Sequence, residues 1–206
     1  MSQIKNIIFD LGGVLLNIDY VKTSTAFKAL GVQGFDDLYS QANANHLFEG
    51  LETGEVEEDA FFQAMAGYCH PETSTSQVQE AWNHILLDFR TSSLDYLKKL
   101  KEKYTLYLLS NTNSIHVKAF NRILREQTGE NSLDDYFTKS YYSHLIRLRK
   151  PYPATYKWVL QDAGINAEET LFIDDSVNNI KGAQEAGLIT HLLLPGEKIE
   201  KLSLLK

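Results

Sequence analysis

Three short apolar segments of this chain each end on a small polar or acidic residue and then enter a loop. The segments and the residues that follow them are 7–9 with Asp10, 107–109 with Ser110, and 171–173 with Asp174. Short apolar runs bounded in this way are typical of buried strands in a parallel sheet. The carboxyl ends of parallel strands meet at one edge of an open α/β sheet, where ligands bind. We therefore expect these three segments to build one binding site.

Two kinds of pattern divide the rest of the chain. Residues 19–88 show the helical spacing of apolar side chains and no convincing strand, whereas strands and helices alternate from about residue 89 onward. Such alternation predicts parallel strands joined by right-handed crossovers. The sequence therefore predicts an α/β protein with a doubly wound, Rossmann-like parallel sheet built from residues 1–18 and 89–206, and a helical segment inserted after the first strand.

Local signals place several boundaries within this plan. Gly31 is expected to close the first helix of the inserted segment, since glycine readily follows a helix C-terminus. Ser76 and Gln79 have the spacing of a capping box, which predicts a helix that carries Leu86 on its apolar face. No element is predicted for residues 197–206.

The charge balance limits the partners that such a chain can bind. With 20 Lys and Arg against 27 Asp and Glu, the net charge is −7, which disfavours a broad nucleic-acid surface. Any phosphate site must therefore supply its positive charge locally. A basic stretch does occur, and we interpret it as a solvated face. Its members are Lys139, His144, Arg147, Arg149 and Lys150.

The cysteine content and the apolar pattern favour a cytoplasmic protein. The single cysteine, Cys69, allows neither an internal disulfide nor a cysteine metal cluster. The chain begins without a basic region followed by an apolar one, and no apolar stretch is long enough to span a bilayer. We expect a cytoplasmic protein with no membrane or nucleic-acid partner, and the oligomeric state stays open.

Acidic residues at the strand ends indicate a metal site. Asp10, Asp174 and Asp175 would converge at one edge of the predicted sheet, where their charges repel one another. A divalent cation relieves that repulsion, and a set of oxygen ligands favours Mg²⁺. The alternative is that each aspartate only caps a turn or a helix. The combination of these residues with Lys150 favours the metal site.

Polar groups near the other strand end could hold an anion. Ser110 and Asn111 begin a polar stretch before a helix, where hydroxyl and N–H groups can form an anion cradle; the alternative is an ordinary helix N-cap. Lys150 precedes another helix, and its ammonium could neutralise a phosphate and the carboxylates. The alternative for Lys150 is a solvated loop lysine.

In chain order, these residues resemble the four motifs of the haloacid dehalogenase-like (HAD) hydrolase superfamily. The matching stretches are 9–14, Ser110-Asn111, Lys150-Pro151 and Asp174-Asp175. Residues 19–88 are similar to the helical cap domain of that family, so the resemblance covers nearly the whole chain. Within the family, the stretches look like the sugar-1-phosphate phosphatase (α-glucose-1-phosphatase-like) branch.

The resemblance implies a Mg²⁺-dependent phosphatase that hydrolyses a small phosphorylated metabolite, such as a sugar phosphate. Asp10 would attack phosphorus and form an aspartyl-phosphate. The implied metal ligands are Asp10, the Gly12 carbonyl and Asp175, with Asp174 close by or acting through water. The implied phosphate contacts are Leu11, Gly12, Ser110, Asn111 and Lys150.

One position departs from the family pattern. Phosphatases of this family usually carry a second aspartate two residues after the nucleophile, as a general acid and base, and this chain has Gly12 there. Three explanations stay open: a leaving group that departs unaided, an acid supplied by the cap, or a protein that binds substrate and turns over slowly. The cap candidates for the acid are His46, Glu49 and Glu52.

The cap is expected to close over the site and to select the substrate. Its candidate substrate contacts are Asn43, His46 and Glu49. A second type of enzyme that the resemblance allows is a 2-haloacid dehalogenase-type hydrolase, which uses the same nucleophile without a metal. The paired Asp174 and Asp175 argue against it. A third reading is a binding protein that retained the family architecture and lost turnover.

Overall fold

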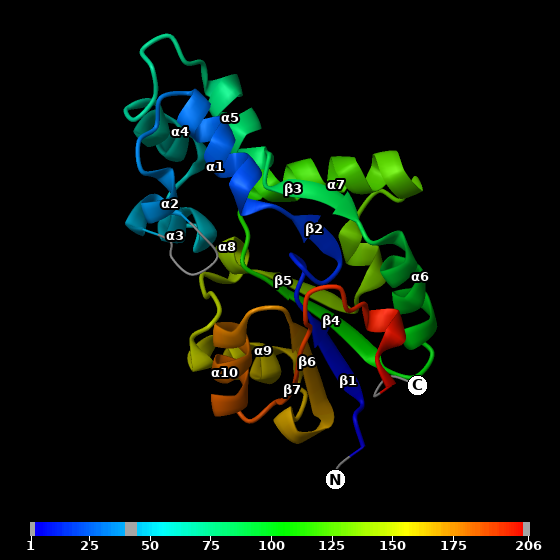
Figure 1. Ribbon diagram of the computed structural model, residues 1–206. Helices are drawn as coiled ribbons and strands as arrows, with labels where there is room; N and C mark the ends of the chain where they lie inside the picture. Colours follow the sequence, from blue (N-terminus) through cyan, green and yellow to red (C-terminus); the bar gives the residue numbers. More distant parts are fainter. Residues whose placement is uncertain (1–2, 40–44, 204–206) are drawn as a thin grey trace.

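A parallel sheet of five strands organises the protein, seen here in a computed structural model that describes residues 3–39 and 45–203 (Figure 1). The strands are β1 (Asn6–Phe9), β4 (Thr105–Ser110), β5 (Lys139–Tyr142), β6 (Thr170–Asp174) and β7 (Ile189–Leu192). Their order across the sheet is β5-β4-β1-β6-β7. β1 lies in the centre, with Phe9 in register with Leu108 on one side and Ile173 on the other. The ends of β1, β4 and β6 are therefore adjacent.

Helices cover both faces of this sheet. They are α6 (Thr91–Leu100), α7 (Ser114–Thr128), α9 (Pro153–Ala163) and α10 (Val177–Glu185). Ile7 and Phe9 of β1 share a buried cluster with side chains of α6 and α7, whereas Ile8 shares one with α9 and α10. This alternation follows from the period of two residues along a strand. Burial on both faces explains the continuous apolar runs in the sequence, and the predicted doubly wound α/β architecture is confirmed.

The inserted segment forms a helical layer beyond the carboxyl ends of the strands (Figure 1). Its helices are α1 (Tyr20–Ala29), α2 (Phe35–Leu38), α3 (His46–Glu52), α4 (Glu58–Ala66) and α5 (Thr75–Asn83). They pack around an aromatic cluster, in which the rings of Phe48 and Trp82 lie 5.2 Å apart and those of Phe61 and Trp82 lie 5.5 Å apart. The division into residues 19–88 as a cap and 1–18 with 89–206 as the core stays a prediction.

A two-stranded antiparallel ribbon connects the two layers. It consists of β2 (Leu16–Ile18) and β3 (Leu86–Phe89), with Leu16 opposite Phe89. The prediction that residues 19–88 contain no strand was wrong, because β3 begins at Leu86. β2 and β3 are short and are stabilised by pairing with each other, although they lie about 70 residues apart in the chain. Local periodicity carries no signal of such a distant partner.

Two further sequence predictions need correction or completion. The capping box uses Ser74 and Gln77, and α5 ends at Asn83, so Leu86 does not lie on that helix. Both hydrogen bonds of a capping box are made by the earlier pair, and the helix therefore begins two residues before the predicted start. Gly31 follows α1 with a φ of 97°, as expected for a residue after a helix C-terminus.

The remaining elements are short helices along the sheet edges and near the C-terminus. They are α8 (Ser143–Ile146) and three 3₁₀ helices, η1 (Leu133–Tyr136), η2 (Ala167–Glu169) and η3 (Ile199–Lys201). In η3, Ile199 is buried in the cluster under α6, so part of the segment without a prediction is ordered against the core. Among the residues described, no helix combines the length and the apolar character needed to cross a membrane.

Candidate active site

Three carboxylates meet at the carboxyl ends of β1 and β6. Asp10 directly follows β1, Asp174 is the last residue of β6, and Asp175 follows it. One carboxylate oxygen from each residue lies within 4.8 Å of the other two. Asp10 and Asp174 are buried, and Asp175 is half-buried. The structure thus brings together the acidic residues that the sequence placed at separate strand ends, at distances that one cation could span.

The Lys150 ammonium lies within this group. Its Nζ donates to Asp10 Oδ1 at 2.6 Å and to Asp174 Oδ2 at 2.7 Å, and the residue is only 1% exposed. The interpretation of Lys150 as a solvated loop lysine is therefore wrong. A charged lysine is rarely buried unless it is paired, and here two aspartates from different strands provide the compensating charge.

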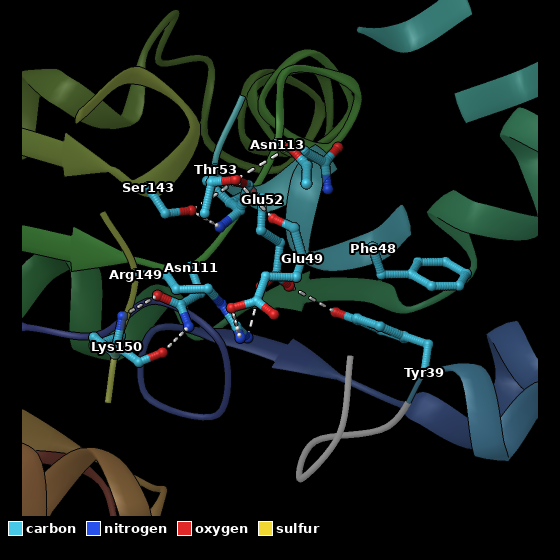
Figure 2. Close-up of polar contacts among 12 residues, drawn as sticks. Tyr39, Phe48, Glu49, Glu52, Thr53, Asn111, Asn113, Ser143, Arg149 and Lys150 are labelled. Atoms are coloured by element: carbon cyan, nitrogen blue, oxygen red, sulfur yellow. Dashed lines mark hydrogen bonds and ion pairs between the residues drawn. The ribbon is translucent and has the colours of Figure 1, made fainter. Parts of the chain in front are cut away.

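Asn111 holds the backbone of Lys150 in place. Asn111 Oδ1 accepts from the Lys150 N–H and Asn111 Nδ2 donates to the Lys150 carbonyl, both at 2.9 Å (Figure 2). The side chain of Asn111 is therefore occupied in fixing the loop that presents the ammonium. The phosphate contact that the resemblance implied for Asn111 is through its N–H group and stays a prediction; its side chain binds the Lys150 backbone.

The two aspartates of the fourth motif differ in their surroundings. Asp174 accepts from the Ser176 N–H at 2.8 Å, from Asn179 Nδ2 at 3.1 and 3.0 Å, and from Lys150. A carboxylate has about four lone-pair sites, so Asp174 has little capacity left for a metal ion. A cation would therefore bind at Asp10 and Asp175, while Asp174 orients Lys150.

Burial and mutual repulsion change the acidity of this cluster. Burial raises the pKa of the Asp10 carboxyl well above its usual range; Lys150 opposes this effect, and the charges of Asp174 and Asp175 add to it. Burial, followed by the charge of Asp174, raises the pKa of Asp175 to about 6. Burial alone would lower the pKa of Lys150, but the charges of Asp10 and Asp174 raise it, so the ammonium is retained.

Burial is the largest cause of the raised pKa values of Asp10 and Asp175, and the protein also places more negative than positive charge in the cluster. The available donors are carboxylate oxygens, and the group contains no His or Cys. A hard divalent cation such as Mg²⁺ fits that donor set and would supply the missing positive charge.

The loop after Asp10 brings the backbone close to the carboxylates. Gly13 has a φ of 74°, and a Cβ added there would lie 2.5 Å from Asp175 Cγ. A Cβ on Gly12 would instead meet the end of the flexible Ile18 side chain, with Cδ1 at 2.9 Å. The turn therefore requires glycine at Gly13. The Leu11 carbonyl accepts from the N–H groups of residues 14–16, which closes this loop over the strand end.

The second motif contributes both to the site and to the start of α7. Ser110 is buried at the end of β4. The Thr112 N–H donates to Ser143 Oγ at 2.9 Å, and Asn113 caps α7 by accepting from the His116 N–H at 3.0 Å. The N-cap interpretation is correct for Asn113, and the anion cradle at Ser110 and Asn111 stays a prediction.

The candidate residues of the inserted segment differ in whether they contact the core. Asn43 lies outside the described residues, and His46 is exposed at the start of α3. Glu49 and Glu52, further along α3, reach the core at Arg149, with Glu49 Oε1 3.4 Å from Nη1 and Glu52 Oε2 2.9 Å from Nη2 (Figure 2).

Arg149 is a residue whose role the sequence did not indicate. Its side chain is 17% exposed, so its assignment to a solvated face was wrong. Of the same basic stretch, Lys139 and Arg147 are exposed, as expected for a solvated face. The signal in the sequence that could have drawn attention to Arg149 is its position directly before Lys150.

The site and the architecture define a hydrolase family. The family model for haloacid dehalogenase-like hydrolases matches residues 4–187. The chain belongs to this family.

Individual relatives are similar over nearly the whole chain. A D-ribitol-5-phosphate phosphatase of Bacteroides thetaiotaomicron is 33% identical over 188 residues, which cover 91% of each protein. A HAD family enzyme of the same species, solved in complex with magnesium and inorganic phosphate, superimposes with a TM-score of 0.85 at 39% identity and covers 95% of this chain and 97% of its own. A predicted HAD-like hydrolase of Porphyromonas gingivalis gives a TM-score of 0.86 at 33% identity, covering 95% of this chain and 94% of its own.

Proposed function

We propose that this protein is a Mg²⁺-dependent phosphatase that hydrolyses a small phosphorylated metabolite through an aspartyl-phosphate on Asp10. The observation that carries the proposal is the cluster of Asp10, Asp174 and Asp175 around the buried ammonium of Lys150. Phosphoryl transfer depends mainly on positioning and on neutralising charge, and this cluster provides both. The Bacteroides relative was solved with magnesium and inorganic phosphate bound, which supports Mg²⁺ and a phosphate group as the species that this chain binds.

Each residue has a distinct task in the proposed reaction. Mg²⁺ held by Asp10, Asp175 and the Gly12 carbonyl would neutralise charge on the phosphoryl oxygens. Lys150 would exchange its contact with Asp10 for a phosphoryl oxygen, and Ser110 with the N–H groups of Leu11, Gly12 and Asn111 would hold the others. Asp10 is the nucleophile because it combines access to the ion with a position at the end of the central strand.

The reaction has two displacement steps. An Asp10 oxygen forms a bond to phosphorus while the ester oxygen of the substrate leaves with the electron pair and takes up a proton. Water then attacks phosphorus, the bond between phosphorus and the Asp10 oxygen breaks, and inorganic phosphate leaves the regenerated carboxylate. Splitting the hydrolysis in this way replaces one difficult displacement by two easier ones.

The named relative suggests the kind of substrate. An enzyme for D-ribitol 5-phosphate hydrolyses a phosphate ester of a polyol, and we infer a sugar or polyol monophosphate for this chain. A primary alcohol is a poor leaving group, so the missing acid at Gly12 limits the rate unless the cap supplies one. Of the three cap candidates, Glu49 and Glu52 contact the core, and Glu49 is the more accessible of the two.

Phosphate release from a panel of metabolites tests this proposal. The panel contains polyol phosphates, sugar 1-phosphates and sugar 5- and 6-phosphates, each with Mg²⁺ and with a chelator. Release from at least one substrate that requires Mg²⁺ and disappears in Asp10→Asn supports the proposal. Equal release from wild type and Asp10→Asn, or none from the whole panel, contradicts it.

Assays on the same purified protein distinguish two alternatives from the proposed phosphatase. A binding protein without turnover is favoured by Gly12, and it would bind inorganic phosphate with Mg²⁺ but release none from any ester. A dehalogenase-type hydrolase would release chloride from a 2-chloro acid without Mg²⁺, with Asp10 as the nucleophile and no metal-binding role for Asp174 and Asp175.

A further inference from the structure

One ion-pair network joins the cap to the loop that carries Lys150. Arg149 Nη2 lies 2.9 Å from Glu52 Oε2 and Nη1 lies 3.4 Å from Glu49 Oε1, and both carboxylates belong to α3. The Tyr39 hydroxyl, also from the inserted segment, donates to Glu52 Oε1 at 3.3 Å (Figure 2). Arg149 therefore reaches from the third motif into the helical layer above the site.

This network is too buried to be a typical surface salt bridge. Glu52 is 5% exposed, and burial raises the pKa of its carboxyl, an effect that Arg149 opposes. Arg149 Nε is buried with no hydrogen-bond partner in the described part of the chain, so the guanidinium depends on the two glutamates. A buried ion pair is weak evidence of a role in stability, because desolvation offsets much of its attraction. A role at the neighbouring site explains the network better.

The backbone around Arg149 transmits the position of this side chain to Lys150. The Arg149 carbonyl accepts from Thr155 Oγ1 at 2.7 Å, and the adjacent Lys150 backbone is held on both sides by Asn111. The loop is thus fixed on the core side by Thr155 and Asn111. On the cap side it is held through the Arg149 side chain and, more weakly, by the Tyr152 hydroxyl, which donates to Glu49 Oε1 at 3.4 Å. A displacement of α3 would therefore move Arg149, and with it the backbone of the adjacent Lys150.

A second core–cap ion pair provides a comparison. Lys118 of α7 lies 2.7 Å from Glu58 of α4, but their side chains are 67% and 27% exposed. Neither residue belongs to the carboxylate cluster or to the loop of Lys150. Loss of that pair would weaken the contact between the layers without touching the Lys150 loop.

We propose that Arg149 is a positioning residue: paired with Glu52 and Glu49, it holds Lys150 in place for the phosphoryl group while α3 is docked over the site. Cap docking and phosphate binding are thereby coupled through the Arg149 side chain. This inference rests on the proposed function, since it assigns Lys150 to the phosphate.

Binding of inorganic phosphate in the presence of Mg²⁺, measured by isothermal titration calorimetry, tests the proposal without requiring turnover. Residues coupled through contact typically show interaction effects that correspond to factors of two to about a hundred, and we expect Arg149→Met to weaken phosphate binding about tenfold. In a Lys150→Met background the same change should have no further effect, because Arg149 acts through Lys150. Independent effects of the two changes overturn the proposal.

A second cycle avoids the risk that Lys150→Met leaves two buried aspartates unpaired and fails to fold. Glu52→Gln leaves the contact between Arg149 and Glu49, so it should weaken phosphate binding by less than Arg149→Met does, and the double variant should be no weaker than Arg149→Met. Arg149→Lys keeps the charge but reaches one carboxylate at most, and its affinity should lie between those of wild type and Arg149→Met. Phosphate affinity in Glu52→Gln equal to that of wild type overturns the coupling.

Lys118→Met is the matched control and should bind phosphate as wild type does. If it weakens phosphate binding as much as Arg149→Met, general cap docking is responsible and the role of Arg149 is refuted. Wild-type protein that neither binds phosphate nor hydrolyses any ester refutes the proposed function together with this inference. Wild-type protein that binds phosphate, with unchanged affinity in Arg149→Met, refutes only the inference.

Discussion

Two adjacent glycines in the loop after Asp10 give opposite expectations for the same substitution. At Gly13, a φ of 74° is strained for any residue with a Cβ, at a cost of about 1–2 kcal/mol. The added Cβ would also lie 2.5 Å from Asp175 Cγ, so the carboxylate must move by about 1 Å to reach ordinary van der Waals distance. Overpacking of this kind costs a further 1–3 kcal/mol or so.

Gly13→Ala should therefore destabilise the protein by about 2–5 kcal/mol in free energy of unfolding, which for a chain of this size lowers the melting temperature by roughly 4–20 °C. It should also weaken Mg²⁺ binding at least tenfold or so, because Asp175 is displaced from the ion. Gly12→Ala is the matched control. Its Cβ meets only the flexible end of Ile18 at 2.9 Å, so both properties should stay near those of wild type.

Differential scanning fluorimetry and calorimetric Mg²⁺ titration of the two variants decide this prediction. The reasoning is refuted if Gly13→Ala has the melting temperature and Mg²⁺ affinity of wild type. It is equally refuted if Gly12→Ala shows the larger loss, since the geometry places the carboxylate beside Gly13 alone.

Three further predictions follow from the site. Gly12→Asp should accelerate hydrolysis of esters with poor leaving groups by about a hundredfold if general acid catalysis is limiting; an unchanged kcat would show that another residue already supplies the proton. Mg²⁺ affinity should rise between pH 5.5 and 8, because the pKa values of Asp10 and Asp175 are raised and protons occupy these carboxyls at the lower pH. Calorimetric Mg²⁺ titrations at both pH values check this, and equal affinities would contradict it. Asn111→Ala should lower stability by about 1–3 kcal/mol through the loss of its two bonds to the Lys150 backbone and should weaken phosphate binding; unchanged chemical denaturation would contradict the assigned role.

The parts of the structure that depend on local pattern were predictable from the sequence. The central strands are recognisable because both faces are buried, which makes segments such as 171–173 apolar without interruption. The carboxyl-end rule for open α/β sheets then placed Asp10 and Asp174 at one edge before any coordinates were considered. Helices of the inserted segment followed from their apolar spacing.

Features that depend on distant partners were not predictable in this way. The ribbon of β2 and β3 exists because two short segments pair across the inserted helices. The burial of Lys150 depends on two aspartates, 140 and 24 residues away in the chain. Arg149 resembles any basic loop residue until the position of α3 is known. In each case the deciding interaction is tertiary, so composition and periodicity could not reveal it.

The central claim is that Asp10 and Asp175 share one Mg²⁺, and calorimetric titration of Mg²⁺ into the protein at pH 8 tests it most directly. We predict a single site in wild type, a loss of affinity of about tenfold or more in both Asp10→Asn and Asp175→Asn, and wild-type binding in Asp95→Asn, whose carboxylate is 76% exposed on α6. Undiminished Mg²⁺ binding in either Asp10→Asn or Asp175→Asn would contradict the account.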